Sequence, residues 1–131
     1  MRILFSPLGD TDPVRGCYDG AMLHIVRHYQ PERIVLFYTH DMAEKERHDH
    51  RYTRAVQRLA PECQIEEVFT EIRDAHLYES FSRILPQEVL RIHETFPGST
   101  LLLNLSSGTP QMKTVLAMLA SDMEDCIGVQ V

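Results

Sequence analysis

The segment from Asn104 to Lys113 gathers hydroxyl, amide and basic side chains around one glycine, Gly108. Thr109 followed by Pro110 is typical of a helix start, with threonine as the N-cap and proline at the first helical position. The free N–H groups of a helix N-terminus attract anions, and a glycine before them lets a phosphate approach the backbone closely. The segment therefore predicts a phosphate-binding loop, although a capped strand-to-helix turn without a ligand fits the same residues.

A second polar loop, from Gly9 to Tyr18, combines carboxylates and a hydroxyl with a guanidinium and an aromatic ring. Arg15 and Tyr18 are suited to stack on an unstacked nucleotide base or to hydrogen-bond with it. A solvated loop with no ligand is the alternative for both side chains.

The strands that must position these loops follow from the apolar pattern. Continuous apolar runs at 2–8, 33–38 and 100–103 predict strands that are covered on both faces. Residues 63–69 and 126–131 alternate between apolar and polar, which predicts strands with one exposed face.

The helices are predicted from apolar residues at helical spacing. One helix is expected at about residues 18–30, and another from Met42 to Ala60 with a solvated first half. A third is expected from about Ala75 to Phe96, kinked or split at Pro86, and a fourth follows Thr109.

Five strands that alternate with four helices predict a Rossmann-like α/β fold, with a parallel sheet and helices on both faces. If the two alternating strands lie at the edges, the spatial order of the strands is 3-2-1-4-5. The switch point then lies between strands 1 and 4, and ligands bind there at the carboxyl ends of the strands. We therefore expect the loops at 9–18 and 104–109 to meet.

Length and composition exclude several classes of protein. The 131 residues, 44% of them apolar, suit a single domain over residues 1–131. A net charge of −6 argues against binding long RNA or DNA, which depends on basic surface. Neither a signal peptide nor a membrane span is predicted, so we expect a cytoplasmic protein. Cys17, Cys63 and Cys126 lack CxxC spacing and are expected to be reduced thiols.

No metal or cofactor is expected. His24 with His28, and His48 with His50, are close in sequence but lack a third ligand of clear spacing. A Rossmann enzyme that uses a mononucleotide or dinucleotide is a weaker alternative, because no Gly-x-Gly-x-x-Gly follows the first strand.

Four motifs together carry a resemblance to a known family: Gly9-Asp-Thr-Asp-Pro13, Leu23-His-Ile25, Arg33-Ile-Val-Leu36 and Asn104-Leu-Ser-Ser-Gly-Thr-Pro-Gln111. Through them the chain resembles the CARF domain, the CRISPR-associated Rossmann fold, and most closely the amino-terminal CARF domain of the type III-A CRISPR effector ribonucleases. The resemblance extends over essentially the whole chain. Asp10 stands where a small or hydroxyl residue is more usual, and its carboxylate opposes a phosphate unless it points away or Arg15 neutralises it.

The resemblance implies a homodimer that binds a cyclic oligoadenylate across both copies, with the hexa-adenylate ring favoured and the tetra-adenylate ring possible. Some members of the family also open the ring. Two functions therefore stay open, a slow ring nuclease and a sensor that only binds. Full effectors carry a ribonuclease domain of the HEPN type after the CARF domain. No such domain is recognisable here, which implies an excised sensor domain or a stand-alone member.

The expected site residues come from both loops and the helix start. Cleavage without a metal requires a ribose 2′-OH in line with the adjacent phosphate, and donors for the developing charge. Thr109, Ser107 and Thr11 are the catalytic candidates; Lys113 is a charge partner or simply an exposed helical lysine. We expect Thr109→Ala and Asn104→Ala to weaken ligand binding more than folding. The predicted ligand-binding residues are Gly9, Asp10, Thr11, Asp12, Arg15, Tyr18, Asn104, Ser106, Ser107, Gly108, Thr109, Gln111 and Lys113.

Overall fold

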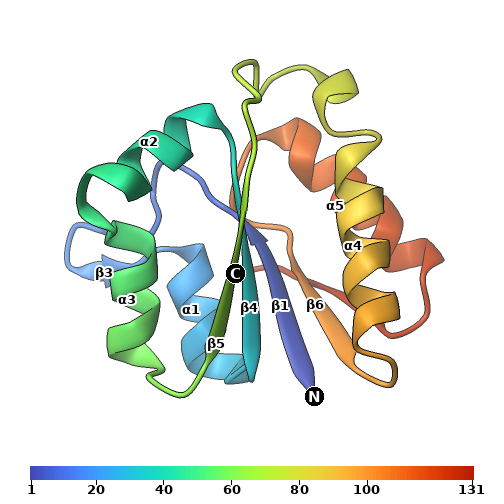
Figure 1. Cartoon of the computed structure of the whole chain (residues 1–131), viewed down its shortest axis with the longest axis horizontal. Helices are drawn as coiled ribbons and strands as arrows, with labels where there is room; N and C mark the ends of the chain where they lie inside the picture. The colour runs from blue at the N-terminus through green and yellow to red at the C-terminus, as the bar shows by residue number, and fades with distance from the viewer.

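A computed structural model describes residues 1–131 as a five-stranded sheet between two layers of helices (Figure 1). The strand order is β5-β4-β1-β6-β7 and every neighbouring pair is parallel, which confirms the predicted Rossmann-like fold and strand order. In chain order the elements are β1 (Arg2–Pro7), β2 (Val14–Arg15), β3 (Tyr18–Asp19), α1 (Ala21–Tyr29), β4 (Arg33–Tyr38), α2 (His40–Asp49), α3 (Arg51–Leu59), β5 (Gln64–Phe69), the 3-10 turn η1 (Tyr78–Ser80), α4 (Ile84–Thr95), β6 (Thr100–Asn104), α5 (Pro110–Asp122) and β7 (Cys126–Val129).

The three central strands are buried and the two outer strands are not. All residues of β1, β4 and β6 after the first are buried, whereas β5 and β7 leave several side chains exposed or half-exposed. This difference agrees with the continuous and alternating apolar patterns, because only a strand flanked by neighbours and covered by helices on both faces loses all contact with water.

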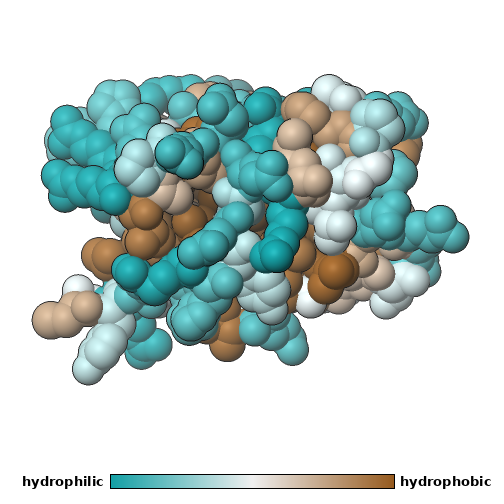
Figure 2. Space-filling model, turned by 90° about the horizontal axis from the view of Figure 1, so that it is seen from below, coloured by the Kyte–Doolittle hydropathy of each residue, from teal (hydrophilic) through white to brown (hydrophobic).

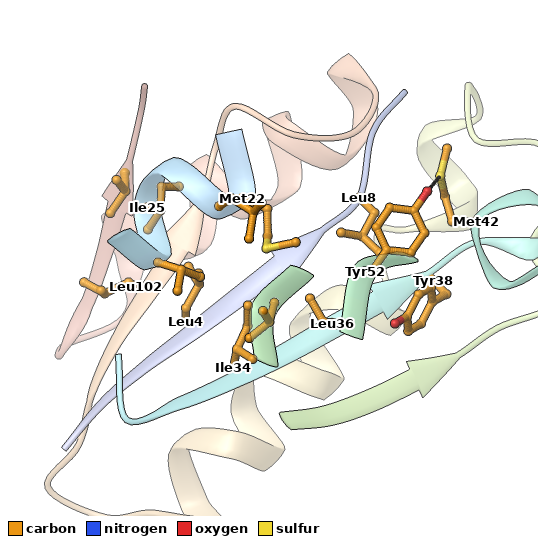
Figure 3. Packing of buried hydrophobic residues seen from close by; sticks show 14 of the residues in the cluster. Leu4, Leu8, Met22, Ile25, Ile34, Leu36, Tyr38, Met42, Tyr52 and Leu102 are labelled. Carbon is orange, nitrogen blue, oxygen red and sulfur yellow. Dashed lines mark hydrogen bonds between the residues drawn. The ribbon is translucent and has the colours of Figure 1, made fainter. Parts of the chain in front are cut away.

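Each face of the sheet has its own apolar core, because successive residues of a strand point to opposite faces. Leu4 belongs to the core under α1, α2 and α3, and Phe5 belongs to the core under α4 and α5. Figure 3 shows the first core, where Met22 and Ile25 of α1 lie over side chains of the central strands. Helices therefore cover both faces of the sheet, and the connecting loops lie at the two ends of its strands.

The carboxyl ends of β1 and β6 lie side by side. The two strands pair in register from Arg2 and Thr100 to Phe5 and Leu103. In Figure 1 the loops that follow them leave the upper end of the sheet, opposite the amino terminus. The two polar loops therefore start from adjacent points.

The first helix is shorter than predicted. Residues 18–20, expected to begin the helix, instead complete a hairpin in which Tyr18 pairs with Arg15 and Asp19 with Val14. Helix α1 begins at Ala21, where the apolar helical spacing also begins.

The predicted helix from Met42 to Ala60 is two helices. His50 adopts a left-handed conformation (φ 55°) and separates α2 from α3. The buried carboxylate of Glu46 accepts hydrogen bonds from the Tyr52 and Thr53 amides and from the Thr53 hydroxyl, so it supplies the cap that α3 lacks locally. The expected solvated first half is also wrong, since Met42, Ala43 and Glu46 are buried.

Pro86 neither kinks nor splits a helix. Helix α4 begins at Ile84, so Pro86 lies in its first turn, where a missing N–H removes no helical hydrogen bond. Residues 75–83 contain only the short turn η1, and the buried ring of Phe81 anchors this segment to the second core. None of the helices is long and apolar enough to cross a membrane.

Candidate functional site

The loop after β6 is built around the fully buried side chain of Asn104. Its amide nitrogen donates to the hydroxyls of Ser6 (3.0 Å) and Ser107 (2.9 Å). Its amide oxygen accepts from the backbone amides of Ser106 (2.8 Å) and Ser107 (3.1 Å). All the hydrogen-bonding capacity of the carboxamide is therefore used within the protein. Asn104 holds the loop in shape and acts on a ligand only through it.

Asp12 has the corresponding role in the loop after β1. Its carboxylate is buried and accepts from the Gly9 amide (2.9 Å) and from the Met22 amide in the first turn of α1 (3.1 Å). The Asp12 side chain, which was predicted to contact the ligand, therefore points inward and joins the loop to α1. Gly20 packs against this turn, because a β-carbon there would lie 2.2 Å from the Thr11 carbonyl oxygen.

The two loops touch at a pair of glycines. A β-carbon on Gly9 would lie 2.9 Å from the amide nitrogen of Gly108, a distance that real β-carbons essentially never show. Gly108 itself has a φ of 90°, a conformation that L side chains rarely adopt. The predicted meeting of the loops therefore takes place through backbone, with no side chain between the two glycines.

The N-terminus of α5 is left uncapped. Thr109 and Pro110 occupy the predicted N-cap and first helical positions, but the Thr109 hydroxyl makes no capping hydrogen bond. That hydroxyl is buried without any partner. The backbone amides of Gln111 and Met112 also donate to no protein acceptor. Unused donors at the positive end of a helix of this length are suited to bind an anion.

Both serines of the loop are engaged. The hydroxyl of Ser107 is buried against Asn104, and the hydroxyl of Ser106 accepts from the backbone amide of Val131 (2.8 Å). Ser106 therefore ties the candidate site to the chain that leaves β7. Each hydroxyl still has its own proton to donate.

The remaining predicted residues lie farther out. Asp10 and Thr11 are exposed, and the cation that pairs with the Asp10 carboxylate is Lys45 of α2 (3.8 Å), not Arg15. Arg15 and Tyr18 are exposed on the β2–β3 hairpin, which Figure 1 shows at the side of the molecule next to α3. These two side chains do not converge with the β6 loop within one copy of the chain.

Lys113 is half-buried and lies one turn into α5, where its backbone amide donates to the Thr109 carbonyl (3.1 Å). Sequence reasoning missed Lys45, because nothing in the charged segment around it marks the one lysine that reaches the first loop.

Tyr52 lies close to the first loop, and its pKa is strongly shifted. Burial, opposed by Arg51 and helped by the carboxylates of Asp12 and Asp10, raises the pKa of Tyr52 to about 12. Its hydroxyl donates a hydrogen bond to the sulfur of Met42 (3.1 Å; Figure 3). The phenol stays protonated near neutral pH, so it cannot act as a general base for a ligand at these loops.

The histidines do not gather into a metal-binding group. The rings of His24 and His28 lie side by side on α1, with their centroids 4.2 Å apart and their planes tilted by 38°. No three His, Cys, Asp or Glu side chains lie close enough together to hold a metal ion.

A hollow with a volume of about 880 Å³ lies at the opposite end of the sheet. It is formed where β4 and β5 begin, among Val26, Arg33, Leu59 and Phe96. Figure 2 looks onto this end and shows hydrophobic side chains between hydrophilic ones. The hollow lacks the free helix amides and the glycine contact, so we place the candidate site at the carboxyl ends.

The fold and the β6 loop can now be compared with known proteins. The family model of the Cas_Csm6 CARF domain matches residues 62–131, more than half of the chain, including β6 and the start of α5. The chain belongs to the Csm6 CARF domain family. The resemblance drawn from the two loops is therefore confirmed.

Relatives of this CARF domain extend the match over most of the chain. It is 39% identical over 123 residues to the CRISPR system endoribonuclease Csm6 of Enterococcus italicus, covering 90% of this chain and 29% of the relative. It is 43% identical over 114 residues to the Csm6 endoribonuclease of Mycobacterium tuberculosis, covering 87% of this chain and 28% of the relative. The chain thus spans less than a third of these relatives.

A solved structure agrees with the fold of this CARF domain. Enterococcus italicus Csm6 bound to cyclic hexa-2′-fluoro-hexa-dAMP superposes with a TM-score of 0.88 and 37% sequence identity, covering 100% of this chain and 33% of that chain. The CARF fold is therefore shared along the full length of the 131 residues.

Proposed function

We propose that this CARF domain binds a cyclic oligoadenylate at the carboxyl ends of β1 and β6. The observation that carries the proposal is the uncapped start of α5, where two free amides and the unpaired Thr109 hydroxyl lie beside the Gly9–Gly108 contact. A relative of the same fold is bound to a cyclic hexanucleotide analogue of this class, which supports the choice of ligand.

The geometry suits a ring of phosphates and riboses. One phosphate sits over the amides of Gln111 and Met112, where the helix dipole favours its charge. The Thr109 hydroxyl, which is buried in the free chain, becomes exposed when the ring binds and then donates to a phosphate oxygen or accepts from a 2′-OH. Asn104 and Asp12 hold the two loops in place and touch the ligand only indirectly.

We further propose that two copies bind one ring. A ring of identical nucleotides with even symmetry matches two copies of one loop set related by a two-fold axis. Arg15 and Tyr18, which lie away from the β6 loop of their own copy, are then available to reach the outer adenines. We expect hexa-adenylate to bind better than tetra-adenylate.

The proposed turnover is a slow transesterification. A ribose 2′-oxygen attacks the adjacent phosphorus, the bond from phosphorus to the 5′-oxygen breaks, and the 2′-OH proton leaves as the 5′-oxygen gains one. The product is a linear oligoadenylate with a 2′,3′-cyclic phosphate and a 5′-OH. Thr109, with Ser107 and Thr11 as further candidates, would align the 2′-OH and stabilise the charge on phosphate.

A sensor that binds without cleaving is the second candidate function. The relatives that carry this domain are endoribonucleases more than three times its length, so binding here is suited to controlling a separate catalytic part. The absence of a side chain clearly poised as a general base favours this alternative, or a low rate of turnover.

One experiment separates these possibilities. Purified protein is mixed with cyclic tri-, tetra- or hexa-adenylate, and binding is measured by calorimetry, mass by light scattering and products by mass spectrometry. Tight binding of one ring per two chains supports the site and the dimer. Products with 2′,3′-cyclic phosphate ends, formed equally with a chelator present, support the nuclease. An intact ring after long incubation with excess protein leaves the sensor, and no binding to any ring refutes the proposal.

A further inference from the structure

The side chain of Gln111 has a hydrogen-bonding need that the protein does not meet. It is the second residue of α5, and its amide oxygen is buried without a donor. A buried acceptor without a partner is unfavourable, and native proteins rarely keep one away from a functional site. A ligand that brings a donor to this position would relieve it.

A phosphate cannot be that ligand group, because at neutral pH its oxygens mainly accept hydrogen bonds. On the proposed function, the ligand is a ring of adenylates, which has two kinds of donor, the ribose 2′-OH and the N6 amine of the base. The Thr109 hydroxyl, at the N-cap and nearer to the bound phosphate, suits the 2′-OH. The Gln111 side chain is longer than that of Thr109, so its carboxamide can reach beyond the phosphate to a base.

We infer that Gln111 reads the adenine base: its amide oxygen accepts from the N6 amine while its amide nitrogen donates to N7. This pairing is the known match between a carboxamide and the edge of adenine. Guanine places two acceptors, O6 and N7, on the same edge, so the oxygen of Gln111 would face another oxygen. The inference rests on the proposed function and adds a residue that selects the base.

The reading requires a change of side-chain rotamer. In the ligand-free chain the Gln111 oxygen is enclosed, so it turns outward when the ring binds. The unpaired state in the free protein makes this rotation less costly than moving a satisfied amide. The backbone of α5 need not move, because the change is confined to the glutamine torsions.

The experiment compares two rings that differ only in the amine: cyclic hexa-adenylate, and a cyclic hexanucleotide of purine ribosides that lacks every N6 amine. Binding of both is measured by calorimetry for the parent, for Gln111→Leu, and for Gln87→Leu as a control on the exposed face of α4. We expect the parent and the control to prefer the adenylate ring at least about tenfold. Gln111→Leu should bind the two rings within about twofold, through weaker binding of the adenylate ring.

Each other outcome is decisive. If Gln111→Leu keeps the full preference, or if the parent binds both rings equally, the base-reading role is overturned while ring binding stands. If the parent binds neither ring, the proposed function fails with it. Gln111→Leu should melt no earlier than the parent, since it removes an unpaired oxygen. Should it unfold, Gln111→Met replaces it, and the same loss of preference is expected because the thioether is only a weak acceptor for the N6 amine.

Discussion

Gly9 and Gly108 approach so closely that a β-carbon on Gly9 would lie 2.9 Å from the backbone nitrogen of Gly108. The contact joins the loops that follow two adjacent parallel strands, β1 and β6. The order in which the chain adds strands to the sheet reverses between these two strands. It brings the loop held by Asp12 against the loop held by Asn104 without a side chain between them. The two loops therefore meet through backbone, directly before the start of α5.

Gly9→Ala should push the two loops apart. We expect a loss of stability of about 1–3 kcal/mol, as for overpacked sites, and at least a tenfold loss in affinity for cyclic hexa-adenylate. Gly98→Ala is the control, because Gly98 (φ 81°) has open space around it and precedes β6, at the opposite end of that strand from the loop. It should lose about 1 kcal/mol through backbone strain and keep its affinity. Equal affinities for both variants would contradict the role of the contact.

Thr109→Ala should barely change stability. An N-cap threonine normally contributes about 1 kcal/mol, but the Thr109 hydroxyl makes no capping bond and has no partner. We therefore expect a change of less than about 0.5 kcal/mol in urea unfolding, and a clear loss of ring binding and of any cleavage. Thr109→Ser should retain most of both. A destabilisation above about 1 kcal/mol with unchanged binding would mean that the hydroxyl is structural.

Asn104→Ala should mainly destabilise the protein, which reverses the expectation drawn from the sequence. The side chain is fully buried and makes four hydrogen bonds, so its removal leaves the Ser106 and Ser107 amides and two hydroxyls without their partner. We expect a loss of about 3 kcal/mol or more, measured by thermal and urea unfolding, with binding lost as a consequence. A variant as stable as the parent would show that the network is dispensable.

Stability should depend on pH through Glu66. Burial opposes ionisation of its carboxylate, but hydrogen bonds from Arg33 and Arg91 outweigh it and hold the pKa of Glu66 below its ordinary value of 4.5. A lowered pKa in the folded state means that the carboxylate stabilises the fold above this ordinary value, and that the benefit disappears as the pH falls through the lowered pKa.

Glu66→Gln should therefore be less stable than the parent by about 1 kcal/mol at neutral pH, and the gap should close in acid. Glu94→Gln, at an exposed carboxylate of the same α4 that Arg91 belongs to, is the control and should follow the parent at every pH. The measurement is urea unfolding between neutral pH and pH 3. A gap that stays constant over this range would show that ionisation of Glu66 does not matter.

The sequence alone was sufficient for the sheet and for the meeting of the two polar loops. Continuous apolar runs mark β1, β4 and β6 as central strands because burial on both faces leaves no room for polar side chains. The strand order follows from that contrast, and the order brings the two polar loops together. Thr109-Pro110 also marks the start of α5 correctly, since the geometry of a helix start is set by neighbouring residues.

The tertiary structure decided what each polar side chain does. Asn104 and Asp12 are residue types that often contact ligands, yet hydrogen bonds to backbone groups of their own loops hold both side chains inward. The Thr109 hydroxyl, in contrast, does not make the N-cap hydrogen bond that its position in the sequence predicts. The interruption between α2 and α3 at His50 depends on a hydrogen bond that the Glu46 carboxylate accepts from the Tyr52 amide at the start of α3. A side chain's chemical type is local, but its partners are set by how strands, helices and loops pack, and those contacts join residues as far apart as Ser6 and Asn104.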